Sequence, residues 1–339
     1  MNNSKLITLA AVTAPVLLLV LASKMLGFPV FERITTLLLI NMILVLGLQV
    51  FMGNSGILSF AHVAFMGIGA YTSSLFTIPL QMRGMVLPDL YLVLKPVLLS
   101  PYISIAVGAL AAMLIAALVA YPLMRLSDAA AVITSFALLV VMHTIMVNWS
   151  EVTNGPRTLF GVPKATTVYL AAGGAILAAV MALLFKESRT GLLLRAVRDD
   201  EVAAGAMGAN LSMLRWRGFI LSALIAGFAG GLWAHFITSF QPSAFYLKET
   251  FVILGMLVIG GSATVSGAVL GTFLVTFAFE ALRATENALN SSAVFPWQMV
   301  GLTEIVLAVA MIVVLVLRPS GIIGAEEFGA LLQKKRRRA

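Results

Sequence analysis

The stretch ISIAVGALAAMLIAALVAYPL, residues 103–123, is apolar almost throughout and carries no charged residue. A helix needs about twenty such residues to cross a bilayer. The apolar residues do not alternate with polar ones, as they would in the strands of a membrane barrel. Comparable apolar stretches recur along the whole chain. The sequence therefore predicts an all-α, polytopic integral membrane bundle, in which the helices satisfy their own backbone groups.

The overall composition supports this fold class. Hydrophobic residues make up 60% of the 339 residues and charged residues 11%, against about 45–50% and 25% in soluble domains. The chain has no cysteine, which excludes disulfides, thiolate metal sites and cysteine nucleophiles, and its three histidines argue against a histidine-rich metal site. Much of the net charge of +8 comes from KKRRR, residues 334–338. Such a run is typical of a cytoplasmic tail in a membrane protein rather than of nucleic-acid binding.

Two basic segments set the expected topology, the loop 186–217 and the tail 325–339 that contains KKRRR. If both face the cytoplasm, an even number of helices must separate them. The apolar stretches between them are 218–240, 250–283 and 298–317. Stretch 250–283 would be about 51 Å long as one helix, against a hydrocarbon core of about 30 Å. It also contains GGSATVSG (260–267), which predicts a turn and raises the count to four.

The rest of the chain extends this count to ten helices. We expect helices at 98–123, 129–148 and 166–185, with 125–128 inside and 149–165 outside. Stretch 34–80 is again too long for one crossing, and the GNSG of residues 53–56 predicts that it breaks there. Residues 6–26 match a signal peptide only weakly and are expected to remain as the first helix. Both termini are then cytoplasmic, in a single transmembrane domain over residues 1–339.

The segment GNSGILSFAHVAFMGIGAY (53–71) allows two interpretations. Ser55, with His143 or His235 as its base, has the residue types of an intramembrane serine protease. Alternatively, the glycines break a membrane helix and bring backbone groups to a solute pathway, as in other transporters. A Gly-x-Ser-Gly is expected by chance among 28 glycines, so we favour the second interpretation, with His62 as a pore-lining side chain.

The loop 188–219 is long for a connector and keeps helical character. Residues 195–208, RAVRDDEVAAGAMG, predict a short helix with small apolar residues, which Gly208 ends. A solvated connector is the plain alternative. However, long loops that keep secondary structure are more often functional, and alanines here would let a partner dock closely.

The sequence resembles a known family, the permease subunits of bacterial ABC importers for branched-chain (hydrophobic) amino acids. The resemblance is carried, in chain order, by GNSGILSFAHVAFMGIGAY, by TGLLLRAVRDDEVAAGAMGANLSMLRWRGF and the helix after it, by VILGMLVIGGSATVSGAVLG (252–271) and by RPSGIIG (318–324). It implies a multi-pass protein of the bacterial inner membrane that forms half of a pore with a second homologous permease. Cytoplasmic ATP-binding cassette subunits and an external substrate-binding protein are the other implied partners, besides membrane lipid.

The resemblance also implies roles for individual residues. The stretch Glu201 to Gly208 corresponds to the coupling helix that docks on the ATPase. The implied contact residues are Arg195, Arg198, Asp199, Glu201, Ala203, Ala204 and Gly208. No GxxxxGK[ST] motif is present, so we expect no cofactor in this chain, no catalytic residue, and ATP with Mg²⁺ bound by the partner subunits. The outer loop 149–165 is a reduced version of the glycine-rich segment that the resemblance leads us to expect. The identity of the solute is therefore not determined: branched-chain amino acids are the first candidate, and other amino acids, urea or short amides are the alternatives.

The predicted translocation pathway follows the two glycine-rich breaks. Its candidates are Gly53, Asn54, Ser55, Gly56, Ser59, His62, Gly260, Gly261 and Ser262. Polar residues in the other apolar stretches, such as His143, His235 and Glu280, are as well explained by hydrogen bonds between helices, with Arg283 beside Glu280. Glu304 needs a partner or a cavity, and it keeps open a further alternative, an ion-coupled secondary transporter.

Overall fold

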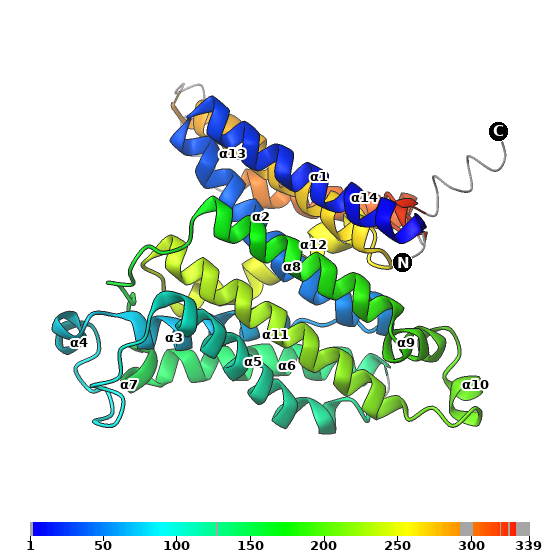
Figure 1. Cartoon of the computed structure of the whole chain (residues 1–339), viewed down its shortest axis with the longest axis horizontal. Helices are drawn as coiled ribbons and strands as arrows, with labels where there is room; N and C mark the ends of the chain where they lie inside the picture. Colours follow the sequence, from blue (N-terminus) through cyan, green and yellow to red (C-terminus); the bar gives the residue numbers. More distant parts are fainter. Residues whose placement is uncertain (1–2, 127, 292–300, 319, 325, 330–339) are drawn as a thin grey trace.

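The computed structural model describes residues 3–126, 128–291, 301–318, 320–324 and 326–329. Within these ranges the regular elements are helices (Figure 1), apart from an isolated antiparallel bridge between Leu159 and Phe240. The long helices are α1 (Asn3–Leu26), α2 (Pro29–Ser55), α3 (His62–Thr77), α5 (Pro101–Leu123), α6 (Asp128–Asn148), α8 (Val168–Glu187), α11 (Leu211–Ile237), α12 (Leu247–Gly260), α13 (Val265–Ser291) and α14 (Leu302–Leu317). The short ones are α4 (Leu80–Val86), α7 (Ser150–Thr153), α9 (Arg189–Asp199), α10 (Glu201–Ala206) and the 3-10 turn η1 (Pro242–Phe245).

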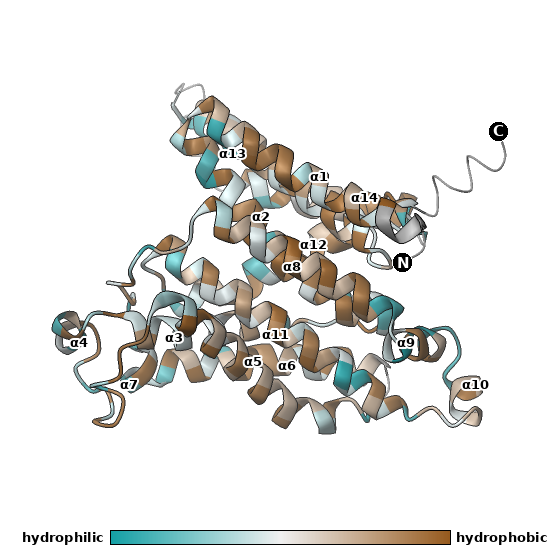
Figure 2. Cartoon of the chain, in the orientation of Figure 1, coloured by the Kyte–Doolittle hydropathy of each residue, from teal (hydrophilic) through white to brown (hydrophobic). Residues whose placement is uncertain are grey.

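The predicted membrane bundle is confirmed. Eight helical segments of the described chain are long and apolar enough to cross a bilayer. They include α12, counted together with the turn η1 that precedes it. Figure 2 shows apolar residues along α1, α8 and α11, with hydrophilic residues gathered around α4 and α9. Each of the ten predicted segments contains a helix, but α3 and α14 have 16 residues each, about 24 Å against a core of about 30 Å.

The break in stretch 34–80 exists and begins at Gly56, the last residue of the predicted GNSG. Gly53 to Ser55 form the last turn of α2, and Gly56 ends the helix with a φ of 76°, a left-handed conformation that glycine adopts without cost. The next helix, α3, begins only at His62. Ser222, which contacts His62, lies about three turns into α11. Residues 56–61 therefore run from the end of α2 back into the bundle, and α3 completes that crossing.

The second break, between α12 and α13, is a short turn of residues 261–264. Gly261 has a φ of 118°, and Gly260 packs directly against α13: an added Cβ there would lie 2.0 Å from the Gly267 carbonyl oxygen. The RPSGIIG segment covers this turn. The amides of Ile322 and Ile323 donate to the last carbonyls of α12, at 3.0 and 3.2 Å. The two predicted breaks thus differ, because one is a short turn and the other a non-helical half-crossing of residues 56–61.

Among the described residues, the start of α1, the basic loop and the last described segment lie at the same end of the bundle, as expected. The amide of Gly329 donates to the Thr8 hydroxyl of α1 at 3.3 Å, and Lys186 at the end of α8 pairs with Glu327. Figure 1 shows the start of α1, the helices α9 and α10, and the last described segment at one end of the bundle, with α4 and α7 at the other. The KKRRR run and the rest of the tail beyond residue 329 lie outside the described residues.

Helices α3, α5 and α11 pack at glycines in the middle of the bundle. A Cβ on Gly69 of α3 would lie 2.1 Å from the Gly227 carbonyl oxygen of α11, and one on Gly108 of α5 would lie 2.5 Å from the Gly69 carbonyl oxygen. Backbones this close leave no room for a side chain, which is how small residues join membrane helices. Helix α2 crosses beside them, buried along most of its length. The candidate site lies where this buried helix ends.

Candidate functional site

The loop 188–219 contains two short helices rather than the single one predicted over 195–208. Helix α9 ends at Asp199, and Asp200 is extended, with φ of −155°. The Asp200 carboxylate accepts hydrogen bonds from the amides of Val202 and Ala203, both at 2.9 Å, and so caps α10. An aspartate in this position offers the backbone an alternative to continuing the first helix. Helix α10 then stops near Gly208, as predicted, at a φ of 84°.

The loop has a small core of its own. Leu194 and Val197 of α9, Ala204 of α10 and Leu214 of α11 are buried against one another. The Glu201 carboxylate pairs with the guanidinium of Arg215, whose side chain is only 5% exposed and also donates to the Leu126 carbonyl. Because α10 is fastened at Ala204 and Glu201, it is held in a fixed orientation on the bundle. Ala204 therefore faces inward, whereas the Glu201 side chain is 41% exposed beside its partner; the contact roles of both residues stay a prediction.

The outward face of α10 includes two of the implied contact residues, Ala203 and Gly208, beside Val202 and Met207, which were not among them. Val202 is 84% exposed and Met207 is 89% exposed, and Ala203, Ala206 and Gly208 are also exposed. An apolar tip of this kind on a polar loop is unusual for a free surface, since large exposed apolar side chains mark interaction sites when they gather. Once Ala204 is known to face the core, helical geometry places Val202 on the opposite side. The sequence alone did not show which way Ala204 faces.

Two of the implied contact residues, Arg195 and Arg198, reach inward to other helices, and Asp199 holds Arg198 in place. Arg195 donates to the Lys186 carbonyl at 3.0 Å. Arg198 donates from Nη1 to the Gly53 carbonyl at 2.9 Å, and Asp199 accepts from Nε and Nη2 of Arg198 at 3.1 and 3.0 Å. The loop is thus tied to the end of α2, a connection over 145 positions of sequence that no local pattern indicates.

The two predicted breaks meet at this same place. A Cβ on Gly53 would lie 2.3 Å from the Ser262 carbonyl oxygen, so the end of α2 lies directly against the turn between α12 and α13. The pathway candidates Gly53, Gly56 and Ser262 are therefore neighbours in space, while Gly261 contacts the RPSGIIG segment. In this conformation the candidates pack against protein, and their role in a pathway stays a prediction.

His62 lies buried at the start of α3 with both ring nitrogens engaged. Its Nε2 is 2.8 Å from the Ser222 hydroxyl and its Nδ1 is 3.0 Å from the Ser59 hydroxyl. Ser222 donates its own proton to the Phe219 carbonyl at 2.7 Å, so Nε2 is the donor and Nδ1 the acceptor. His62 therefore ties the half-crossing to α11, and its pore-lining role is not seen in this conformation.

The geometry does not provide a serine protease site at Ser55. The Ser55 hydroxyl donates to the Phe51 carbonyl at 2.8 Å and accepts from the Ile57 amide at 3.2 Å. His235 lies beside Ser73 and Thr77, and His143 stacks on Tyr246 with ring centroids 4.1 Å apart. No histidine is thus in place to activate Ser55, and the described residues contain no group of three or more histidine, aspartate or glutamate side chains that could hold a metal ion.

Gln49 is a buried polar residue that the sequence analysis did not single out. Gln49 of α2 is fully buried, and neither its amide oxygen nor its amide nitrogen has a hydrogen-bond partner among the described residues. Asn54, one turn further on, donates to the Val50 carbonyl but leaves its oxygen unpaired. Unpaired buried amides are costly, above all within a membrane. The sequence signal was a lone glutamine in the apolar run LGLQVF.

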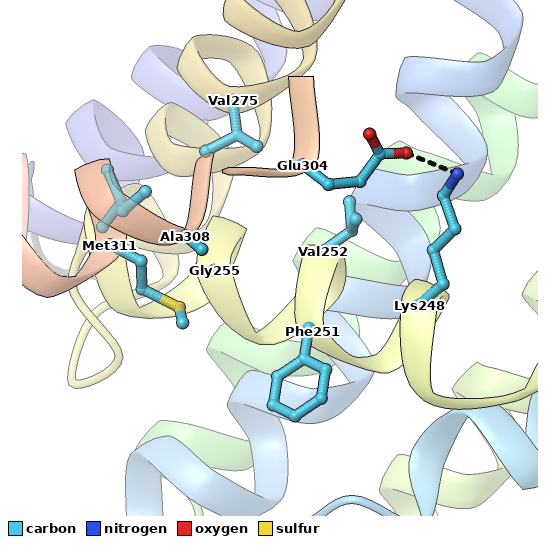
Figure 3. Close-up of a pocket in the computed structure, with 9 residues that line it drawn as sticks. Lys248, Phe251, Val252, Gly255, Val275, Glu304, Ala308 and Met311 are labelled. Atoms are coloured by element: carbon cyan, nitrogen blue, oxygen red, sulfur yellow. Dashed lines mark ion pairs between the residues drawn. The ribbon is translucent and has the colours of Figure 1, made fainter. Parts of the chain in front are cut away.

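Glu304 has the partner that it was expected to need. Its carboxylate pairs with Lys248 of α12 at 2.6 Å, and both side chains are partly exposed. Figure 3 shows this pair at the edge of an otherwise apolar pocket of about 540 Å³ between α12 and α14, with Gly255, Ala308 and Met311 in its wall. Glu280 and Arg283 line a different pocket together with Arg33. The ion pair accounts for Glu304 without an ion-coupling role.

Glu327, which follows the RPSGIIG segment in the sequence, anchors the chain to α8 and α13. Its carboxylate lies 2.5 Å from Lys186 Nζ and accepts from the Val265 amide at 2.8 Å and the Ser266 hydroxyl at 2.7 Å. Burial by itself would raise the pKa of Glu327, but the Lys186 ammonium and these hydrogen bonds hold it below its ordinary value of 4.5. The carboxylate also sits at the first turn of α13, where a negative charge is favoured.

This anchor gives a pH-dependent stability. We expect Glu327→Gln to destabilise the detergent-solubilised protein by about 3 kcal/mol at pH 7, the scale for removing one partner of a buried ion pair. Since the pKa is depressed in the folded state, this contribution is complete above the ordinary pKa and is lost as the pH falls through the folded-state value. Apparent unfolding temperatures from pH 7 down to pH 3 measure it. Asp89→Asn, at an exposed position between α4 and α5, is the control. If the difference in unfolding temperature between Glu327→Gln and the wild type persists undiminished at pH 3, the assignment is contradicted.

Comparison with known proteins matches most of the chain to one family of membrane transport proteins. Residues 30–315 match the model of a family described as "Branched-chain amino acid transport system / permease component". The high-affinity branched-chain amino acid transport system permease protein LivM of Escherichia coli is 26% identical over 284 residues, and that of Salmonella typhimurium is 26% identical over 292. Each alignment covers 74% of this chain and 63% of the relative, so the chain spans less than two thirds of those proteins. The nucleoside ABC transporter permease protein NupC of Lactococcus lactis is 33% identical over 88 residues, which cover 25% of this chain and 27% of NupC. No solved structure matches.

Proposed function

The chain belongs to the permease-component family of branched-chain amino acid transport systems, and from this premise we propose that it is the membrane subunit of an ATP-driven importer. Its solute would be a branched-chain amino acid or a related small polar molecule. The importer would lie in the bacterial inner membrane, with the end that carries α9 and α10 facing the cytoplasm.

The observation that carries this proposal is the exposed apolar tip of α10. A transporter driven by its own ion gradient needs no docking surface at the cytoplasmic end. A permease without an ATPase of its own must receive the movement of another subunit. Val202 and Met207 stand almost fully exposed on a helix that Asp200, Glu201 and Ala204 hold rigidly. A fixed apolar anchor surrounded by charges suits a groove on a partner protein.

The solute pathway would follow the half-crossing of residues 56–61. Non-helical backbone at membrane depth is tolerated where it is buried in protein or lines a cavity. The amides of Leu58 and Ser59 have no hydrogen-bond partner among the described residues. Free amides and the unpaired amide of Gln49 are groups that could bind the charged ends of an amino acid when the bundle opens.

The proposal assigns the remaining tasks to other chains. ATP with Mg²⁺ would be bound and hydrolysed by two cassette subunits, and this chain would bind no cofactor. A second homologous permease would complete the pore, and an external binding protein would deliver the solute. No part of this arrangement requires nucleic acid. Of these partners, the binding protein would set most of the selectivity.

Uptake by the reconstituted complex tests the proposal. The chain, its companion permease and the ATPase subunits are placed in liposomes with ATP inside, and labelled leucine is supplied with the binding protein outside. We expect uptake that requires ATP and stops when ATP is replaced by a non-hydrolysable analogue. Uptake by this chain alone down a proton or sodium gradient would instead establish a secondary transporter, with Glu304 or Gln49 as the first residues to examine.

A further inference from the structure

Arg198 occupies a position that docking on a partner does not explain. It stands in the last turn of α9, yet its guanidinium turns toward the bundle and donates to the Gly53 carbonyl of α2 at 2.9 Å. Asp199 fixes the guanidinium through Nε and Nη2. All three nitrogens of the fork are therefore engaged inside the chain.

The acceptor is one of the carbonyls that a helix end leaves without a partner. Gly53 lies three residues before Gly56, where α2 stops, and the last four carbonyls of a helix cannot bond within it. A cation is also favoured at this end of a helix. Arg198 thus satisfies a carbonyl at the end of α2, a helix that is buried along most of its length.

Glycine at two positions of α2 lets this contact form. A Cβ on Gly56 would lie 2.7 Å from Cγ of Arg198, so the side-chain stem lies flat on Gly56. On its other side, Gly53 touches the Ser262 carbonyl in the turn between α12 and α13. A displacement of Arg198 therefore reaches the end of α2 and, through it, the second break.

Helices α9 and α10 are built to move together. Asp200 joins them directly, and Leu194 and Val197 of α9 share a small core with Ala204 of α10. A force on the tip of α10 would thus be passed to α9 and to Arg198. Helices packed in this way shift as units rather than bend continuously.

We propose that Arg198 is the positioning residue that transmits movement of α10 to the end of α2. This inference rests on the proposed function, in which a cassette ATPase moves α10. It differs from the expectation that Arg198 contacts the ATPase: Arg198 acts inward, on the Gly53 carbonyl, and Val202 with Met207 form the docking surface. The transmitted movement would separate Gly53 from Ser262, where the two breaks meet.

Substitution of Arg198 gives the first test, in the complete reconstituted complex. We expect Arg198→Ala to keep ATPase subunits bound and hydrolysing ATP, while the solute transported per ATP falls at least tenfold. Arg189→Ala, which removes the same charge from the exposed start of α9, is the matched control and should behave as the wild type. Loss of the ATPase subunits from the Arg198→Ala complex would make Arg198 a docking contact, and unchanged transport per ATP would overturn the proposal altogether.

A covalent replacement of the link is the sharper test, because the chain has no cysteine of its own. A Cβ on Gly56 would lie 3.9 Å from Cβ of Arg198, the spacing of a disulfide. The double variant Gly56→Cys, Arg198→Cys lacks the guanidinium and should transport poorly when reduced. When the two thiols are oxidised to a disulfide by copper phenanthroline, α9 and α2 are again connected, and transport per ATP should recover at least threefold.

The outcomes separate this inference from the proposed function. If transport per ATP recovers on oxidation and is lost again with dithiothreitol, the result supports a mechanical link between α9 and α2. A contact that only stabilised the fold would not give this recovery. A disulfide that forms fully without recovery contradicts it. If the disulfide does not form in folded protein, the two helices are not in contact as described and the inference fails. If the wild-type complex shows no ATP-dependent uptake, the proposed function fails instead.

Discussion

Replacing Met207 with glutamate is expected to lower the amount of ATPase that co-purifies with the chain at least tenfold, while the chain still inserts in the membrane. Met207 is 89% exposed at the tip of α10, so the substitution costs the folded chain almost nothing. In a complex, however, it would bury a carboxylate without a partner, which typically costs several kcal/mol. Affinity purification in mild detergent, with the chain tagged, measures the effect.

Met85→Glu is the matched control for this substitution. Met85 is 77% exposed on α4, at the opposite end of the bundle from α10 (Figure 1). The control should retain the ATPase. Equal retention by the two variants would mean that the tip of α10 is not the docking surface. Glu201→Lys should also weaken the complex, but through a different cause, because it would place two cations together at Arg215 and release α10 from the bundle.

Gly230→Ala is expected to produce the largest loss of stability, about 3 kcal/mol or more, because no side chain can move to make room. An added Cβ would lie 1.9 Å from the Met66 carbonyl oxygen of α3, so α3 and α11 would have to separate. Forcing extra atoms into a packed core costs about 1–3 kcal/mol even when side chains can adjust, and here only backbone is available. The apparent unfolding temperature in detergent and the yield of monodisperse protein measure the change.

Gly173→Ala controls for the general effect of removing a glycine from a membrane helix. Nothing lies within 4 Å of a Cβ added at Gly173 of α8. The substitution should leave stability unchanged or raise it slightly, since alanine favours a helix over glycine by about 1 kcal/mol. A Gly230→Ala protein as stable as the Gly173→Ala protein would show that α3 and α11 do not pack through their backbones.

The sequence was sufficient to predict the helices and the existence of the two breaks. Apolar length is a strong signal, because a bilayer fixes the number of residues that a crossing requires. Stretch 250–283 could not be one helix for that reason, and the structure ends α12 at Gly260. The start of α1, the basic loop and the last described segment lie at one end of the bundle (Figure 1), as the charge reasoning requires, while the KKRRR run lies outside the described residues. The first break begins at Gly56, the last glycine of the predicted GNSG, where a positive φ ends α2.

The arrangement of the candidate site could not be predicted from local patterns. Whether a residue of α10 points inward depends on Leu214 and Arg215, which belong to another helix. The hydrogen bond from Arg198 to Gly53 joins segments far apart in the sequence. The run 56–61 contains no residue pattern that distinguishes a non-helical half-crossing from a surface turn. Gln49 could be recognised as polar, but its lack of a partner is a property of the packed bundle alone.

Cross-linking from the tip of α10 tests the central claim most directly. Met207→Cys introduces the single thiol of the chain, and a short thiol-to-amine cross-linker is applied to the assembled complex in membranes. We predict an adduct between this chain and an ATPase subunit, suppressed by removal of the ATPase, with none from Met85→Cys at the other end. An assembled, transporting complex that yields no ATPase adduct from residue 207 would contradict the assignment of α10 as the coupling helix.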